Sequence, residues 1–157
     1  MIFVNKINVL KEEIMKTINE ITNQTPVFLH DWSCAEEVFY DFENVNSWDA
    51  DEKKEIALDK HKDDHILFAS YTYENYSGDA FVLFENNGVL YEVNGSHCSC
   101  YGLEGQWDRE KVVLEEMEHR LIKGDFGRDD WVGNKFHKEL CEFLGIELGG
   151  DDYEYRI

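Results

Sequence analysis

Residues 79–93 read DAFVLFENNGVLYEV, and this stretch decides the fold class. Two runs of apolar, β-branched and aromatic residues flank Asn86-Asn87-Gly88. Asn and Gly accept the positive φ angles that tight hairpin turns require, so the stretch predicts two antiparallel strands, 79–85 and 89–93. A similar run at 66–73 precedes them and is followed by a turn at 76–78. The three runs together predict an antiparallel meander.

Helical periodicity is found on both sides of this meander. We expect helices over residues 8–23, 33–44, 49–60, 108–124 and 130–144. In the third of these, Ile56 is expected to face inward. The order ααα-βββ-αα predicts an α+β fold, in which a three-stranded antiparallel meander packs with about five helices. We expect a single domain over 1–148 and an acidic, exposed tail over 149–157.

Acidic residues dominate the charge of the chain. Its 157 residues carry a formal net charge of −19, from 34 acidic and 15 basic residues. Residues 31–64 alone hold twelve acids against four bases. Such a field repels nucleic acid and anionic lipid and attracts basic protein surfaces, so we expect neither direct nucleic-acid binding nor membrane binding. The chain has no long apolar run or signal peptide, so we expect a cytoplasmic protein with reduced cysteines.

Two of the expected helices place carboxylates on one face. Glu37 and Asp41 lie one turn apart on the second helix, and Glu52, Glu55 and Asp59 share a face of the third. Successive carboxylates of the third helix are separated by about 4.5 and 6 Å along its axis. The phosphates of a DNA strand are about 3.4 Å apart along the duplex. Such a row can imitate a phosphate ladder, although a solvated surface diluted by nearby lysines is the commoner interpretation.

Residues 95–107 read GSHCSCYGLEGQW and concentrate the ligand-type side chains of the chain. His97, Cys98 and Cys100 offer metal ligands within four residues. His137 and Cys141 are four apart on the last helix and therefore share a face. Two cysteines of the turn and this pair match the ligand types of a tetrahedral zinc site, but the spacing is not that of a standard zinc finger.

The same segment supports two further interpretations. Cys98 or Cys100 is a candidate nucleophile, with His97 or His119 as base and Glu104 or Asp108 to orient it. The negative field opposes such activation, because it raises the pKa of a thiol. Alternatively the segment is a structural corner, with its glycines selected for backbone conformation. No pattern identifies a reaction, so we favour a binding role over an enzymatic one.

Aromatic side chains alternate along the expected meander. Because one face of the sheet must be core, the other face is a candidate recognition patch. The residues concerned are Tyr71, Tyr73, Tyr76, Phe81, Phe84 and Tyr91. We expect Trp107 and Trp131 at the edges of the core.

The segments SGDAFVLFE (77–85), GVLYEV (88–93) and GSHCSCYGLEGQW (95–107) resemble a family of small hypothetical proteins from bacteriophages, prophages and plasmids. The resemblance covers about residues 68–121 and implies no established activity. It suggests an accessory protein that inhibits a host nucleic-acid enzyme, in the manner of anti-CRISPR or anti-restriction proteins. The sequence thus favours an acidic protein that binds a basic nuclease, with a metal-binding or thiol-dependent domain as the alternative.

Overall fold

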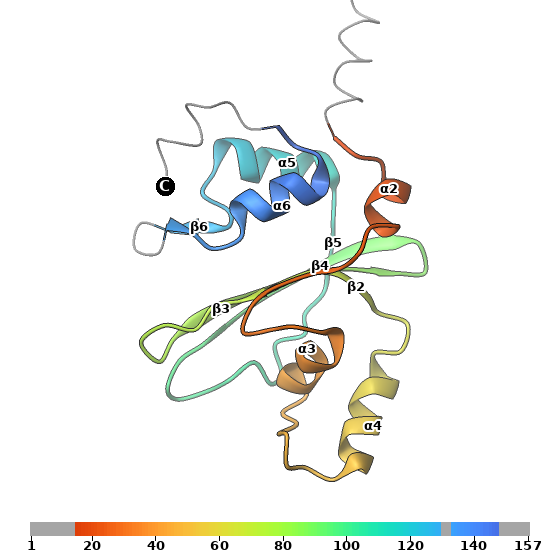
Figure 1. Ribbon diagram of the computed structural model, residues 1–157, viewed down its shortest axis with the longest axis vertical. Coiled ribbons are helices and arrows are strands. Elements are labelled where there is room, and N and C mark those ends of the chain that lie inside the picture. The colour runs from red at the N-terminus through yellow and green to blue at the C-terminus, as the bar shows by residue number, and fades with distance from the viewer. Residues whose placement is uncertain (1–14, 130–132, 148–157) are drawn as a thin grey trace, which may run out of the picture. The chain divides into compact units, whose positions relative to one another are not determined.

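The computed structural model describes residues 15–129 and 133–147 (Figure 1). Two compact units are formed: one spans Thr25–Val112, and the other combines chain before Thr25 with chain after Val112. The tail expected over 149–157 lies outside the described residues. Within the described residues, no helix combines the length and apolar character needed to cross a membrane.

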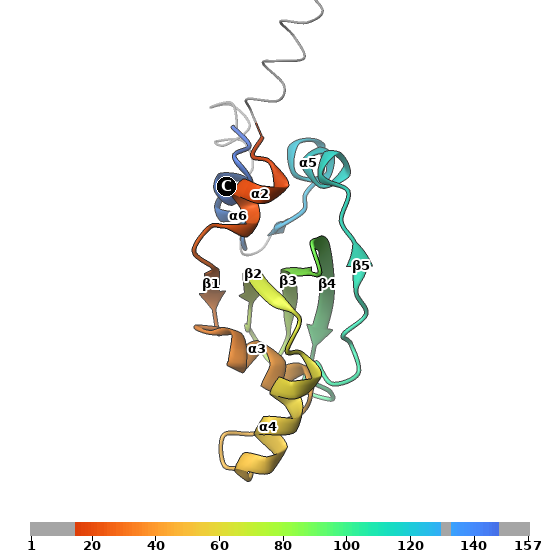
Figure 2. The same ribbon diagram turned by 90° about the vertical axis from the view of Figure 1, so that its right-hand side faces the viewer.

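A five-stranded mixed sheet forms the unit Thr25–Val112, with strand order β1-β2-β3-β4-β5 (Figure 2). The strands are β1 (Val27–His30), β2 (His65–Tyr71), β3 (Gly78–Asn86), β4 (Val89–His97) and β5 (Glu110–Lys111). The antiparallel strands β2, β3 and β4 follow one another as predicted, and Asn87 and Gly88 form the β3–β4 turn with φ angles of 50° and 83°. The hairpin that decides the fold class is therefore confirmed.

The prediction of a three-stranded sheet is wrong, because two strands were not expected. β1 pairs in parallel with β2, with Val27 opposite Phe68, and β5 pairs antiparallel with β4. A separate two-stranded sheet is formed by β6 (Arg128–Asp129) and β7 (Gly133–Asn134). β1 is four residues long and β5 two, so neither is long enough to show the alternation by which a strand is recognised.

Two helices, α3 (Ala35–Phe42) and α4 (Asp51–Lys60), connect β1 to β2. They lie on one side of the sheet, and α4 extends away from it (Figures 1 and 2). Beneath α3, the ring of Trp107 meets Phe42 edge-on at 4.9 Å and stacks on Phe84 at 5.0 Å. Such aromatic pairs favour a defined geometry beyond the burial of area. This cluster anchors α3 to the sheet and leaves α4 at the periphery.

The second unit contains three helices within the described residues: α2 (Ile18–Thr22), α5 (Leu114–Lys123) and α6 (His137–Leu144). The backbone N–H of Lys16 donates to Leu144 O at 2.9 Å, and the Gln24 side-chain amide donates to Phe143 O at 2.8 Å. These bonds fasten the segment around α2 to the end of α6. Together with α3 and α4, five helices are described, as expected. α3, α4, α5 and α6 begin later than predicted, and the first part of the helix expected over 8–23 lies outside the described residues.

Gly78, the first residue of β3, is required by close backbone packing. A Cβ placed there would overlap the carbonyl oxygen of Thr72 and lie 2.5 Å from Cε1 of His97. At Gly102 the nearest obstacle is only the carboxylate end of Glu104, at 2.6 Å, which can swing away.

We therefore expect Gly78→Ala to lower the free energy of unfolding by about 1–3 kcal/mol, because backbone cannot move aside as a flexible side chain does. Gly102→Ala is the matched control and should cost little. Urea unfolding of both variants measures the difference. Equal stabilities of the two variants would show that the β2–β3 turn tolerates a side chain.

Candidate functional site

The outward face of α4 carries three of the predicted partner-binding residues. Successive residues of a helix are rotated by about 100°, so Glu52, Glu55 and Asp59 fall within about 60° of one another. All three are exposed, whereas Ala57, on the opposite side of the helix, is buried. Among the described residues, none of these carboxylates takes part in an ion pair.

The lysines of α4 do not neutralise this face, although the sequence places them beside it. Lys53 pairs with Asp49 at 3.2 Å, and Lys60 pairs with Glu43 at 2.8 Å. Lys54 donates to the carbonyl oxygen of Ser47 at 3.1 Å. Each lysine thus binds a group away from the outward face, which leaves its carboxylates uncompensated.

Two large apolar side chains on α4 and just before it are exposed. Ile56 is 63% exposed, so the expectation that it faces inward is wrong. It lies about 40° from Glu52 around the helix, on the outward face. Trp48, shortly before α4, is 81% exposed. We call Trp48, Glu52, Glu55, Ile56 and Asp59 the α4 surface.

The two remaining predicted residues lie on α3 and bind groups of this chain. Glu37 accepts hydrogen bonds from the backbone N–H of Ser33, at 2.8 Å, and from its hydroxyl. These bonds tie the first turn of α3 to the residue before its N-cap, Cys34, and lower the pKa of Glu37. Asp41 accepts the indole N–H of Trp32 at 2.7 Å, and desolvation raises its pKa despite that bond. Both residues therefore have structural roles on α3.

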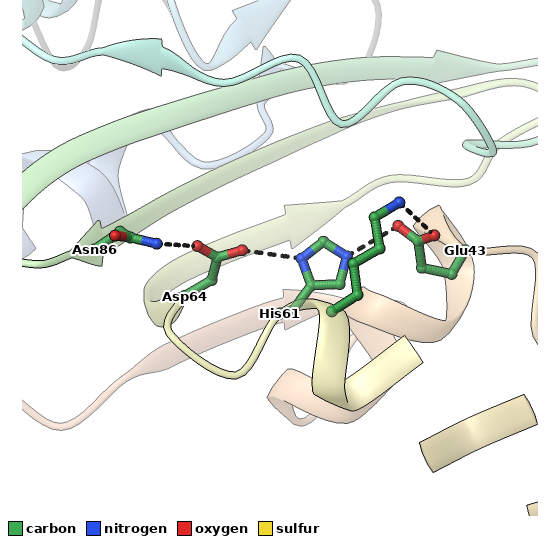
Figure 3. A network of polar contacts seen from close by, with 5 residues as sticks. Glu43, His61, Asp64 and Asn86 are labelled. Atoms are coloured by element: carbon green, nitrogen blue, oxygen red, sulfur yellow. Dashed lines mark hydrogen bonds and ion pairs between the residues drawn. The ribbon is translucent and has the colours of Figure 1, made fainter. Parts of the chain in front are cut away.

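A network centred on His61 holds α4 in place (Figure 3). His61 directly follows α4, is 2% exposed, and stacks on Phe39 at 4.5 Å. Its Nε2 lies 2.9 Å from Glu43 Oε2 and its Nδ1 lies 2.9 Å from Asp64 Oδ2. Asp64 also accepts the side-chain amide of Asn86 at 2.8 Å. The network thus joins the ends of both helices to the loop before β2 and the end of β3.

The network lowers the pKa of both its carboxylic acids. Each ring nitrogen of His61 lies within hydrogen-bond distance of one of them. Burial raises the pKa of Glu43 and of Asp64, but hydrogen bonds from Lys60 and His61 to Glu43, and from His61 and Asn86 to Asp64, outweigh it. Both pKa values lie below their ordinary range. Because both nitrogens of His61 are engaged, the ring has none with which to accept a proton from a substrate.

Residues 95–107 form a corner that a glutamine side chain closes. Gln106 Oε1 accepts the N–H of Ser96 at 2.9 Å, and its Nε2 donates to the carbonyls of Ser96 and Gly102, both at 2.7 Å. Leu103 is buried within the loop. A Cβ on Gly95 would lie 3.2 Å from both Gln106 and Leu103. These contacts support the interpretation of the segment as a structural corner.

His97, at the end of β4, is 6% exposed, and neither ring nitrogen has a hydrogen-bond partner among the described residues. The ring stacks on Tyr73 at 4.7 Å and meets Tyr71 edge-on at 5.0 Å. Desolvation raises the pKa of Tyr71, and nearby carboxylates, Asp41 first among them, add to it. His97 is thus packed as an aromatic side chain.

The predicted zinc ligands differ in burial and in their hydrogen-bond partners. In residues 15–129 and 133–147, no three His, Cys, Asp or Glu side chains are grouped so as to hold a metal ion. His137 Nδ1 bonds the carbonyl of Phe126 at 2.9 Å, and its Nε2 lies 3.8 Å from Cys141 Sγ. This pair is buried. Cys100 is exposed and Cys98 half-buried in the turn after β4.

The predicted aromatic recognition patch does not form on the sheet. Phe81 and Phe84 point to opposite faces of β3, and both are buried. The exposed tyrosines Tyr73 and Tyr76 lie instead between β2 and β3. Trp107 is partly buried in the core, close to the prediction, whereas Trp131 lies outside the described residues.

Sequence reasoning missed Trp48 and the network around His61. A tryptophan among polar and acidic residues (NSWDAD, 46–51) is a signal for an exposed apolar side chain. No comparable signal marks His61, because Glu43, Asp64 and Asn86 stand at irregular distances from it along the chain.

Comparisons with known proteins return no match: no family model fits the chain, and neither curated proteins nor solved structures contain a significant relative. The α4 surface and the turn after β4 must therefore be interpreted from their own chemistry.

The network makes the stability of the protein depend on pH. Because the folded pKa values of Glu43 and Asp64 are lowered, their contribution is complete above about pH 5 and is lost as the pH falls through the folded values. We expect Asp64→Asn to cost about 1–3 kcal/mol at neutral pH, with a smaller difference from the wild type near pH 3.

Asp63→Asn is the matched control, since Asp63 is the exposed neighbour. Urea unfolding at both pH values measures the effect. If the two variants lose equal stability at both pH values, the network contributes nothing specific.

Proposed function

We propose that this chain is an acidic inhibitor that docks the α4 surface on the basic groove of a nucleic-acid enzyme, such as a host nuclease. One observation carries the proposal: Glu52, Glu55 and Asp59 share an exposed face and have no ion pair, while the neighbouring lysines bind elsewhere. A surface that only needed to be soluble would gain from pairing some of these charges, as i,i+4 pairs stabilise helices.

The spacing of the carboxylates suits competition with a nucleic-acid strand. Along the axis of α4 they are separated by about 4.5 and 6 Å, which is wider than the charge spacing of a strand, about 3.4 Å, but of the same order. A groove lined by Lys and Arg attracts the carboxylates of α4 and the phosphates of a nucleic acid alike, because both are negatively charged. The acidic helix would then occupy positions that phosphates otherwise take.

The apolar members of the α4 surface supply what charge alone does not. Exposed ion pairs contribute about 0–1 kcal/mol each, so carboxylates by themselves make a weak and unspecific contact. Tryptophan is among the residues that most often dominate binding energy when buried in an interface. Trp48 and Ile56, at 81% and 63% exposed, are free to provide such an anchor.

Rigid placement of α4 supports this role. The helix buries little of its own surface, but Lys60 and His61 tie its last turn to Glu43. A helix fixed in this way loses less conformational freedom on binding, which favours affinity.

Binding should therefore weaken when the charges of α4 are reversed. We expect the triple variant Glu52→Lys, Glu55→Lys, Asp59→Lys to lose capture of nucleic-acid-binding proteins from a bacterial lysate, while the wild type retains them at low salt and releases them at high salt. Added duplex DNA should displace the captured protein, which is identified by mass spectrometry.

The matched control reverses three exposed acids elsewhere, Glu110, Glu115 and Glu116, and has the same net charge. Retention by this control and loss by the α4 variant would locate the interface. Equal behaviour of the two variants, or capture that duplex DNA does not affect, would contradict the proposal.

Removing the Trp48 side chain tests the apolar contribution to binding separately. We expect Trp48→Ala to weaken the affinity for the identified partner by at least about 2 kcal/mol, roughly thirtyfold, without changing its salt dependence. Isothermal titration at two salt concentrations separates the two contributions. An unchanged affinity would leave charge as the sole determinant of binding.

A further inference from the structure

The turn after β4 brings two cysteines together. The backbone N–H of Cys98 donates to Tyr101 O at 3.1 Å, so Ser99 and Cys100 occupy the corner of a tight turn. Cys98 is half-buried and Cys100 is exposed. Both thiols therefore lie within reach of a small molecule in solvent.

A backbone N–H points at one of these sulfurs. The N–H of Cys100 donates to Cys98 Sγ at 3.3 Å. An N–H that points at a sulfur favours the thiolate over the thiol, so the turn stabilises the reactive form of Cys98. Residues 65–103 contain no Lys or Arg, and a backbone N–H of the turn itself contacts Cys98 Sγ.

The environments of Cys34 and Cys141 disfavour the thiolate. Burial raises the pKa of the Cys141 thiol to about 11, and it also raises the pKa of Cys34. The carboxylates of Glu36 and Glu37 beside Cys34 act in the same direction. Because the thiolate is the reactive form, both should react slowly and serve as internal references for the turn.

We propose that the Cys98–Tyr101 turn is a thiol–disulfide exchange site, in which Cys98 attacks a low-molecular-mass disulfide and Cys100 resolves the product. The thiolate of Cys98 attacks one sulfur of R–S–S–R, forms Cys98–S–S–R and expels R–S⁻. The thiolate of Cys100 then attacks the Cys98 sulfur, expels the second R–S⁻ and closes a Cys98–Cys100 disulfide. The two thiols of the turn lose two electrons and two protons, and the disulfide is reduced to two thiols.

The geometry permits the second step. Consecutive Cα atoms are about 3.8 Å apart, and a turn bends the chain, so residues two apart lie within the range of about 4.4–6.8 Å that disulfides use. The N–H of Cys100 already contacts Cys98 Sγ, which places the residue that carries the second thiol against the first sulfur. This site is independent of α4 and of any protein partner.

The test uses 5,5′-dithiobis(2-nitrobenzoate), an aromatic disulfide whose released thiolate is coloured. In the fast phase the wild type should release two equivalents and keep no adduct, as seen by intact mass. Cys100→Ser should release one equivalent and keep the adduct on Cys98, located by peptide mapping. Cys98→Ser should slow the fast phase at least about tenfold.

Cys34→Ser is the control and should leave the fast phase intact. Circular dichroism confirms that each variant is folded. A fast phase that survives in folded Cys98→Ser overturns the assignment of the attacking thiol. A wild-type adduct that persists on Cys98 overturns the resolving role of Cys100.

Discussion

The ring of His61, held between the carboxylates of Glu43 and Asp64, is the interaction on which the arrangement of the helices depends. α4 buries only Ala57 among its ten residues, so apolar packing alone would hold it weakly. The contacts of Lys60 and His61 with Glu43 hold the last turn of α4 in place. A buried charge is tolerated only when it is paired and hydrogen-bonded. Here Lys60 and Asn86 donate to the remaining carboxylate oxygens of Glu43 and Asp64.

This constraint lets one helix serve a purpose other than packing. A helix that contributes to the core must turn its apolar residues inward, as α3 does with Val38, Phe39 and Phe42. α4, fixed by its end, can expose Ile56 and a set of unpaired acids. The corner 95–107 shows a similar division: Gln106, Leu103 and Trp107 fasten it, and the fastened loop presents Cys98 and Cys100.

The sequence predicted those parts of the fold that local pattern determines. The hairpin around Asn87 and Gly88 follows from turn chemistry and alternation within one stretch. The parallel strand β1 does not, because four residues gain strand structure only from β2, which lies far along the chain. Among site residues, Glu52, Glu55 and Asp59 were recognisable from helical spacing. His61 was not, since its partners converge only in the folded chain.

The parallel pairing of β1 with β2 also has a consequence for the order of folding. The β3–β4 hairpin closes a two-residue turn, whereas β1 reaches β2 only after residues 31–64 have been brought back across the sheet. Closing a longer loop costs more chain entropy before any contact compensates it. The meander should therefore form early, and β1 should join it late. α3 and α4 belong to that connection, so their final position is reached at the last stage of assembly.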